Sequence, residues 1–233
     1  HGLTPQEIFF YRFLIAYIGI WAISPKHLFA DNLKDELWLV AGGVFGGSLY
    51  FFTENTALGI TQASNVAFII CTAPLLTTIL SLLFYKSEKA TKGLIYGSLL
   101  ALIGVGLVVF NGSVVLKLSP VGDLLTLLAA LSWAFYSLVI KRMTGRYPTV
   151  FITRKIFFYG VLTILPAFLL HPLQPDFDVL LQPLVLSNLL FLAVLASLIC
   201  YILWNVVLKQ LGTMRASNYI YLNPLVTMVA SVL

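Results

Sequence analysis

Apolar segments of membrane-spanning length run through almost the whole sequence and leave few folds open to it. Helices of about 20 apolar residues cross a bilayer, and we mark eight such segments, at about 6–24, 37–58, 63–85, 93–111, 121–141, 150–170, 186–208 and 215–233. The chain is 60% hydrophobic and 10% charged, whereas soluble domains carry about 25% charged residues. No stretch alternates as membrane β-strands do. The sequence therefore predicts an all-α membrane protein.

The basic residues fall in alternate loops between these segments. Ten of the 14 lysine and arginine residues lie in the loops after the first, third, fifth and seventh segments. They are Lys26, Lys34, Lys86, Lys89, Lys92, Lys141, Arg142, Arg146, Lys209 and Arg215. The other loops hold Lys117 alone. Because basic loops stay in the cytoplasm, this pattern predicts that these four loops are cytoplasmic and that His1 is on the outer side.

Two apolar segments share a polar opening and an internal proline. Ala63-Ser64-Asn65 precedes Pro74-Leu75-Leu76-Thr77, and Ala216-Ser217-Asn218 precedes Pro224-Leu225-Val226-Thr227. A proline inside a membrane helix frees a backbone carbonyl and bends the helix. Interrupted helices at matching places in two halves point to the binding site of a transporter. We therefore predict that the chain hinges at Pro74 and Pro224; the alternative is two unrelated lipid-facing kinks.

Further matches extend this recurrence to an internal repeat. Leu58-Gly59 matches Leu211-Gly212, and Pro5 with Arg12 matches Pro148 with Lys155. The first three segments then correspond to the last three. We predict one repeat at residues 1–112 that lacks its first helix, and another at 119–233 that lacks its last. The parent protein should have ten helices, eight of them here. Five helices per repeat place the halves in opposite orientations, as in inverted-repeat transporters.

With these residues in view, the chain resembles the drug/metabolite transporter superfamily, specifically proteins with tandem EamA-type domains. The residues that carry this resemblance are Leu3-Thr4-Pro5 with Phe10–Ala16, Leu58-Gly59 with Ala63 and Pro74-Leu75, and Leu127–Ala134 through Arg142. The resemblance covers nearly the whole chain. It implies ten helices, cytoplasmic termini and a central cavity between the two halves. Its motifs consist of small and apolar residues, so it does not identify a solute.

Glu54 and Arg12 are the charged residues most suggestive of transport. Carboxylates at membrane depth are costly and normally face a cavity or a partner. Both residues are expected towards the outer side, so an Arg12–Glu54 pair is predicted. Glu54 either titrates during transport or meets a cationic solute, or the pair only holds helices together. Arg154 and Lys155, near the cytoplasmic end of their segment, are expected to extend to the interface, with solute contact as the alternative.

Polar and aromatic side chains within the apolar segments are candidates for lining a cavity. These candidates are Asn65, Trp133, Tyr136, Trp204, Asn205, Asn218 and Tyr221. For Asn65 and Asn218 the alternative is helix capping, and for the aromatic residues it is packing. Glycines four residues apart, at Gly42 with Gly46, Gly43 with Gly47 and Gly93 with Gly97, predict close approach of helices.

The resulting functional prediction is a secondary transporter of small organic solutes in the plasma (inner) membrane. Its partners are membrane lipid and the solute, without nucleic acid, and the sequence permits a homodimer. No nucleotide-binding loop is recognisable, so a proton gradient or solute exchange is expected to drive transport. We expect no metal and no cofactor, because Cys71 and Cys200 form no ligand pattern. An intramembrane enzyme acting on lipids and a passive channel are the alternatives.

Overall fold

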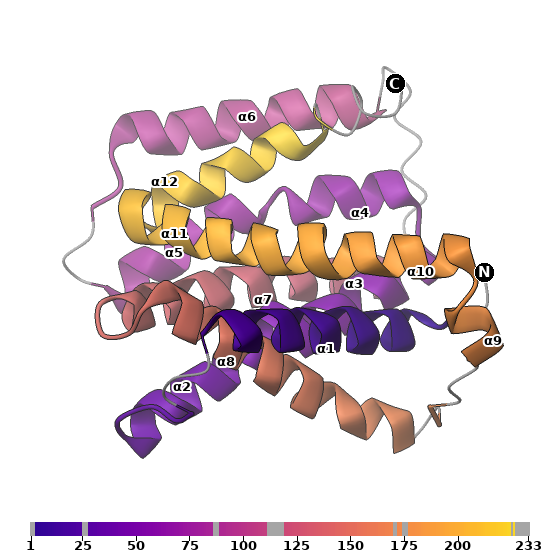
Figure 1. The fold of residues 1–233 in the computed structure, drawn as a ribbon. Coiled ribbons are helices and arrows are strands. Elements are labelled where there is room, and N and C mark those ends of the chain that lie inside the picture. Colours follow the sequence, from indigo (N-terminus) through magenta and orange to yellow (C-terminus); the bar gives the residue numbers. More distant parts are fainter. Residues whose placement is uncertain are drawn as a thin grey trace. The chain divides into compact units, whose positions relative to one another are not determined.

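A computed structural model describes residues 3–24, 28–85, 89–110, 119–169, 172–173, 177–224 and 226. Within these ranges every regular element is a helix (Figure 1), which confirms the prediction of an all-α protein. Among the described residues, five helical segments are long and apolar enough to cross a membrane: Pro5–Ile23, Ala63–Phe84, Pro120–Thr144, Thr149–Leu169 and Pro183–Leu211. Lys92–Leu107 is a shorter apolar helix.

The elements follow the predicted segments closely. The first half contains α1 (Pro5–Ile23), α2 (Leu33–Gly43), the π-helix η1 (Val44–Ser48), α3 (Leu49–Ile60), α4 (Ala63–Ile70), α5 (Ala73–Phe84) and α6 (Lys92–Phe110). The second half contains α7 (Pro120–Thr144), α8 (Thr149–Ile164), the 3₁₀-helix η2 (Leu165–Leu169), α9 (Phe177–Leu180), α10 (Pro183–Leu190), the π-helix η3 (Phe191–Ile199), α11 (Cys200–Leu211), α12 (Thr213–Asn218) and the 3₁₀-helix η4 (Tyr219–Leu222).

Side-chain caps set the start of two helices. Thr4 caps α1: the Glu7 N–H donates to Thr4 Oγ1, and the Thr4 N–H donates to Glu7 Oε2 at 2.8 Å. This reciprocal arrangement satisfies backbone donors that a helix start leaves open. The second segment begins at Leu33, four residues before the predicted start, because Asn32 Oδ1 accepts the Asp35 N–H at 2.8 Å.

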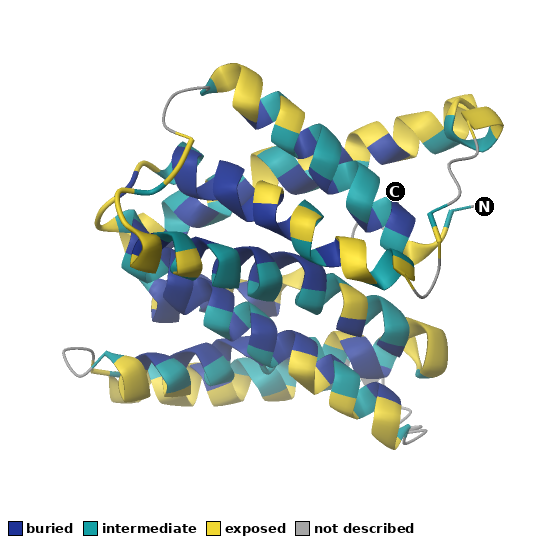
Figure 2. Cartoon of the chain, turned by 90° about the horizontal axis from the view of Figure 1, so that it is seen from below, coloured by how far each residue is buried: buried dark blue, intermediate teal, exposed yellow. Residues whose placement is uncertain are grey.

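Contacts divide the chain into two compact units, and each combines segments from both halves of the sequence. Unit 1 consists of His1–Phe52 and Val139–Lys209. Unit 2 consists of Thr53–Leu138 and Gln210–Leu233. Helices in both units carry buried positions on one side and exposed positions on another (Figure 2).

Glycines allow α2 and η1 to approach α8 closely in unit 1. A Cβ atom on Gly43 would lie 2.5 Å from Tyr159 Cβ and 2.9 Å from the Gly160 N atom. A Cβ atom on Gly47 would lie 3.4 Å from Gly160 Cα. Small residues bring membrane helices into backbone contact in this way, so the prediction for Gly43 and Gly47 is confirmed.

Two π-helical stretches interrupt long helices of unit 1, one in each half of the sequence. A π-helix shifts the backbone hydrogen-bonding pattern and often marks a functional position. At η1 the Gly46 carbonyl accepts a hydrogen bond from the Tyr201 hydroxyl at 2.5 Å. At η3 the Ser197 hydroxyl accepts one from Arg12 Nε at 2.8 Å. The interrupted stretches thus take part in polar contacts between helices of this unit.

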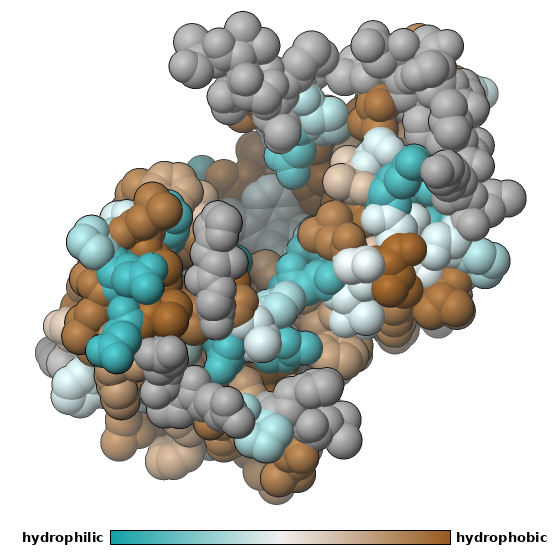
Figure 3. Space-filling view, turned by 90° about the vertical axis from the view of Figure 1, so that its right-hand side faces the viewer, coloured by the Kyte–Doolittle hydropathy of each residue, from teal (hydrophilic) through white to brown (hydrophobic). Residues whose placement is uncertain are grey.

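One face of α6 in unit 2 carries exposed apolar side chains. Ile95, Leu99 and Ile103 are 43%, 45% and 61% exposed, as expected for side chains that face lipid. A Cβ atom on Gly93 or Gly97 would meet nothing within 4 Å. The prediction of close helix packing at these two glycines is therefore wrong for the described residues, since they lie on an open surface. The face drawn in Figure 3 carries hydrophobic and hydrophilic residues side by side.

Candidate functional site

The two proline-containing segments are interrupted, and both interruptions belong to unit 2. Helix α4 ends at Ile70 and α5 begins at Ala73, with Pro74 in its first turn. Helix α12 ends at Asn218 and continues as the 3₁₀-helix η4, directly before Asn223 and Pro224. A bend at each proline was predicted, and each interruption instead lies two to five residues before it. The missing proline N–H removes the bond to the carbonyl four residues earlier, so the preceding turn is the one that changes.

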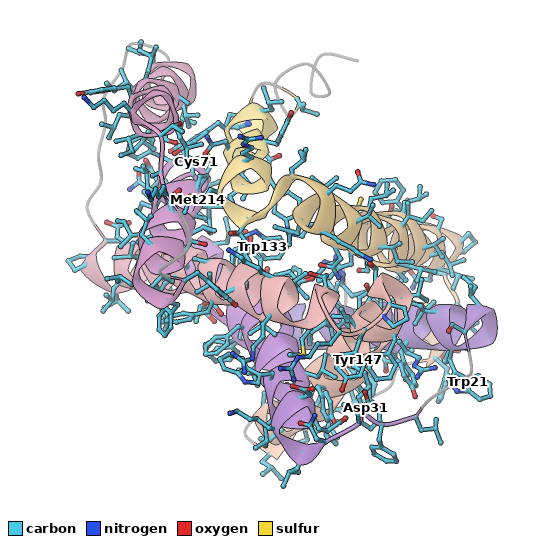
Figure 4. The ribbon with its side chains drawn as sticks, turned by 90° about the vertical axis from the view of Figure 1, so that its left-hand side faces the viewer. Trp21, Asp31, Cys71, Trp133, Tyr147 and Met214 are labelled. Atoms are coloured by element: carbon cyan, nitrogen blue, oxygen red, sulfur yellow. The ribbon has the colours of Figure 1, made fainter. Side chains whose placement is uncertain are left out.

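These two interruptions pack against the same core. Cys71 and Tyr221, each three residues before its proline, form one buried cluster with Val105 of α6. Ser81 of α5 and Thr213 of α12 share a hydrogen bond of 2.9 Å. Cys71 precedes Ser81 by ten residues, whereas Tyr221 follows Thr213 by eight. Because Ser81 contacts Thr213 and Cys71 lies in one cluster with Tyr221, the two segments run in opposite directions. Figure 4 labels Cys71 and Met214 on these neighbouring segments.

A stripe of hydroxyl side chains lines the contact between α5 and α12. Thr77 lies one helical turn before Ser81, and Ser217 lies one turn after Thr213. All four residues are 0% exposed. Within the described part of the chain, Thr77 Oγ1 and Ser217 Oγ have no hydrogen-bond partner. Burying a hydroxyl without a partner costs about 1–3 kcal/mol, and such groups in a native protein call for a functional explanation.

The predicted asparagines precede these interruptions in the chain, and neither caps a helix with its side chain. Asn65 is the third residue of α4 and is 2% exposed. Asn218 is the last residue of α12, and its Oδ1 atom accepts a hydrogen bond from Ser98 Oγ at 3.2 Å. Both have helical positions rather than the extended backbone of a capping residue, so the capping alternative is wrong. Asn218 and Tyr221 lie together with Pro74 in unit 2.

Two predicted aromatic residues and Glu54 also belong to unit 2. Trp133 and Tyr136 of α7 have ring centroids 5.1 Å apart, and Tyr136 is fully buried. Glu54 lies on α3 next to the buried Thr53 and is itself partly buried. Because Arg12 belongs to unit 1, the pairing of Arg12 with Glu54 remains a prediction.

The remaining candidates lie in unit 1, where Arg12 and Asn205 form polar contacts between helices. Besides its bond to Ser197, the Arg12 guanidinium lies 4.7 Å from the centroid of the Phe51 ring. Asn205 of α11 is 0% exposed and donates to Thr153 Oγ1 of α8 at 2.9 Å. Trp204, its neighbour, is partly buried. Such bonds hold apolar helices together in a membrane.

A buried charged cluster in unit 1 joins α2 to α8. Lys155 Nζ forms an ion pair with Glu36 Oε1, and the Tyr159 hydroxyl donates to the same carboxylate. Lys155 Nζ also donates to the Leu28 carbonyl at 3.2 Å. The Lys155 side chain is 4% exposed. The expectation that it extends to the membrane interface is therefore wrong, because the lysine turns to a carboxylate inside the protein.

Arg154 is buried as well, and its expected position at the interface is also wrong. The residue is 2% exposed, and its guanidinium donates to the Ser24 carbonyl. It also lies 5.4 Å from the centroid of the Phe151 ring. Carbonyl and aromatic partners take the place of water around this charge.

A second ion pair binds the start of α2 to the turn before α8. Arg146 Nη1 lies 3.0 Å from both carboxylate oxygens of Asp35, and the Tyr147 hydroxyl donates to Asp35 Oδ2 at 3.1 Å. The Tyr147 oxygen in turn accepts the Asp31 N–H at 3.0 Å (Figure 4). Asp35 is 1% exposed although Arg146 is 55% exposed.

The carboxyl groups of this region have lowered pKa values. Burial by itself raises the pKa of Asp35, but hydrogen bonds from Arg146, Asn32 and Tyr147 outweigh it and hold the pKa below its ordinary value. Burial likewise opposes ionisation of Glu36, and hydrogen bonds from Lys155, Tyr159 and the Ala30 N–H bring its pKa below the ordinary value. Both carboxylates are therefore negative partners at neutral pH.

Sequence reasoning missed Glu36, Asp35 and Arg146 as members of this cluster. One signal was available: Lys155 and Tyr159 are four residues apart and lie on one helix face. Among the described residues, no group of three histidine, cysteine or acidic side chains is placed to hold a metal ion.

Comparison with known proteins gives the class and the family. Apolar helices joined by buried polar contacts define a multi-pass integral membrane protein. The chain belongs to the EamA-like transporter family, whose model matches residues 1–110 and 120–233. This confirms the resemblance stated from the sequence and identifies the chain as a membrane transporter.

Individual relatives agree with this family. An uncharacterized transporter of Archaeoglobus fulgidus is 27% identical over 231 residues, which are 97% of this chain and 78% of the relative. The uncharacterized transporter YyaM of Bacillus subtilis is 29% identical over 81% of this chain and 61% of its own length. A probable amino-acid metabolite efflux pump of Salmonella typhimurium is 25% identical over 99% of this chain and 78% of the relative.

A solved crystal structure has the same fold. It superposes with a TM-score of 0.76 at 20% sequence identity, over 99% of this chain and 80% of that chain. At this identity the likeness concerns the fold alone. It supports the prediction of an inverted-repeat transporter bundle.

Proposed function

We propose that this protein is a secondary transporter that moves small organic solutes across the plasma (inner) membrane by alternating access. The observation that carries the proposal is the contact of two interrupted segments, one from each half of the sequence, inside unit 2. Broken helices of this kind bind substrate in secondary transporters, because their ends present backbone groups in the membrane. Pro74 and Pro224 are the proposed hinges.

The polar side chains at these interruptions are the proposed solute contacts. Thr77 and Ser217 offer buried hydroxyl groups that can donate to a solute or accept from it. Asn65, Asn218 and Tyr221 are in the same unit and add amide and phenol groups. A buried group without a partner favours a ligand that satisfies it and rejects one that does not. We infer that the solute carries neutral hydrogen-bonding groups beside an apolar part.

The division into repeats at residues 1–112 and 119–233 is part of this proposal. Two features support it: an interrupted segment in each half, and a π-helical stretch in the corresponding helices of each half, η1 and η3. The opposite chain directions of α5 and α12 agree with repeats of inverted orientation.

Transport by proteoliposomes tests the proposal. Since one relative is named a probable amino-acid metabolite efflux pump, the first probes are radiolabelled neutral amino acids. We expect saturable uptake, counterflow when unlabelled solute is inside, and loss of net uptake after the proton gradient is collapsed, unless exchange drives it. Flux that rises linearly with concentration and lacks counterflow contradicts a carrier and indicates a channel.

Variants at the hydroxyl stripe connect this activity to the structure. The double variant Thr77→Val with Ser217→Ala removes both unpartnered hydroxyls and should lower kcat/KM by about tenfold, since two hydrogen bonds are lost. Thr126→Val is the control: its hydroxyl is also buried but bonds to the Gly122 carbonyl of its own helix at 2.7 Å. Equal loss of transport in the control and the double variant contradicts a role in solute contact.

A further inference from the structure

A cavity of about 280 Å³ lies within unit 2, where α6 begins and α11 passes into α12. Lys89, Thr91 and Leu94 line it on one side, and Thr213, Met214 and Arg215 line it on the other. The turn between α11 and α12 is fixed by Gly212, whose φ of +78° suits glycine and strains other residues. The lining does not include the interrupted residues before Pro74 and Pro224, although Thr213 belongs both to it and to the hydroxyl stripe.

The charge of the cavity is positive. Lys89 and Arg215 are both exposed and lie on opposite sides of it. None of the described residues that line it is acidic. The adjoining sequence from Lys86 to Lys92 contains three lysines and one glutamate. Two cations at one cavity form a suitable environment for an anion with several oxygen atoms.

An apolar surface continues from the cavity along the membrane. Ile95 and Leu99 follow the lining residue Leu94 on α6 and are exposed, and Leu211 on the other side is 42% exposed. A free anion does not bind to such a surface, whereas the acyl chains of a lipid pack against apolar side chains.

We propose that this cavity binds the phosphate of an anionic phospholipid, with Lys89 and Arg215 as its cationic contacts and the acyl chains along α6. Lys89 precedes α6 and Arg215 lies on α12, both at the ends of segments that the charge pattern places at the cytoplasmic side, so the lipid belongs to the inner leaflet. Basic pockets between membrane helices on this side recognise anionic headgroups. The headgroup of such a lipid and a free phosphate ion both present anionic oxygen atoms to the two cations. The experiment below distinguishes the lipid from the free ion.

Lipid-dependent stabilisation of the purified full chain tests this proposal. The protein in neutral detergent is titrated with phosphatidylglycerol, phosphatidylcholine or inorganic phosphate, and the apparent Tm is measured. A ligand of the folded state raises the Tm with its concentration. We expect phosphatidylglycerol to raise it, with little change from the other two probes.

Charge-matched variants locate the effect. Lys89→Gln with Arg215→Gln removes both cations. Each basic residue near an anionic lipid adds a similar amount to the binding free energy, so the loss of two should weaken phosphatidylglycerol binding by about 30-fold. Lys92→Gln with Lys209→Gln removes the same charge from neighbouring residues that do not line the cavity, and it should bind as the unmodified protein does. Native mass spectrometry of retained lipid provides a second measurement.

Each other outcome overturns the proposal. An equal shift from phosphatidylcholine means that headgroup charge is not recognised. An equal shift from inorganic phosphate means that the site holds a free anion and that the acyl surface is irrelevant. Equal weakening in both double variants means that only overall charge matters. None of these results depends on transport activity, so failure here leaves the proposed function standing.

Discussion

The ion pair between Lys155 and Glu36 is a buried electrostatic contact between α2 and α8. Glu36→Gln leaves a buried ammonium without its carboxylate, and Lys155→Met leaves the carboxylate without its ammonium. Each single variant should lower the free energy of unfolding by about 3 kcal/mol. The double variant should cost clearly less than the two together, because neither charge is then left alone. Equilibrium unfolding in mixed detergent micelles measures the cycle, and simple additivity contradicts the pair.

The lowered pKa values of Asp35 and Glu36 predict how stability depends on pH. Folding favours the ionised carboxylates, so their contribution is fully present above the ordinary values of 3.8 and 4.5. It is lost as the pH falls through the lower values of the folded state. The apparent Tm should therefore change little from about pH 7 to 5 and fall below about pH 4. Glu36→Gln should reduce this fall, and an unchanged profile in that variant contradicts the assignment.

Glu54 is the residue for which a coupling role is proposed. If its carboxyl group carries the proton, Glu54→Gln should abolish the dependence of net uptake on the proton gradient while counterflow of solute persists. Uptake at several external pH values measures this. Asp178→Asn changes the same charge at an exposed residue of α9 and serves as the control. Unchanged uptake and an unchanged pH profile in Glu54→Gln leave the carboxylate with a structural role only.

Individual polar residues were the hardest part to predict from sequence. Glu54 stands out because carboxylates are rare within apolar runs. The two prolines stand out because the motifs around them recur in both halves. The partner of Lys155 is 119 positions away at Glu36, so it depends on which helices pack together. The sequence does not single out Thr77 and Ser217 as site residues, because hydroxyl residues are common in membrane helices and usually bond to their own backbone, as Thr126 does.

At the scale of elements, the crossing of α2 and η1 with α8 depends on the absence of side-chain atoms at Gly43. Gly43→Ala places a Cβ atom 2.5 Å from Tyr159 Cβ and 2.9 Å from backbone, so the helices must separate. We expect a loss of about 1–3 kcal/mol. Gly97→Ala meets nothing within 4 Å and should gain about 0.5–1 kcal/mol, because glycine is unfavourable inside a helix. Unfolding of the two variants side by side tests this, and equal stability contradicts the crossing.

The ends of elements were predictable where a local signal sets them. Thr4 with Glu7 marks the start of α1, within a residue of the predicted start of that segment. The prolines mark the interruptions to within a few residues, because proline acts on the carbonyl of the preceding turn. The π-helical stretches η1 and η3 were not predicted. Val44–Ser48 has the composition of an ordinary membrane helix, and the bond from Tyr201 to the Gly46 carbonyl comes from a distant segment.

At the scale of the whole molecule, the loop charges predict which residues face each side of the membrane. In a background with Cys71→Ser and Cys200→Ser, a cysteine at Gly145 should be protected in intact cells from an impermeant maleimide. A cysteine at Gln62 should be labelled. Gly145 and Gln62 are both exposed turn residues, so access of the reagent decides the result. Labelling of Gly145→Cys with protection of Gln62→Cys reverses the predicted orientation.

The overall architecture was largely predictable, because the bilayer requires apolar helices of nearly fixed length and the loop charges orient them. The two compact units were not. Each takes helices from both halves of the sequence, and that grouping depends on side-chain fit between segments such as α5 and α12. The positions of the repeats in the sequence do not reveal which helices pack against each other.

The stripe of Thr77, Ser81, Thr213 and Ser217 also has a consequence for movement. Its hydroxyls recur every four residues on both α5 and α12, and the two helices run in opposite directions. A displacement by one turn, about 5.4 Å, brings Thr77 opposite Thr213, or Ser81 opposite Ser217, and so exchanges one pair of hydrogen-bonding neighbours for another. A pair of facing hydroxyls would thus remain at this interface after one helix shifted by a turn along the other, a movement known from allosteric proteins.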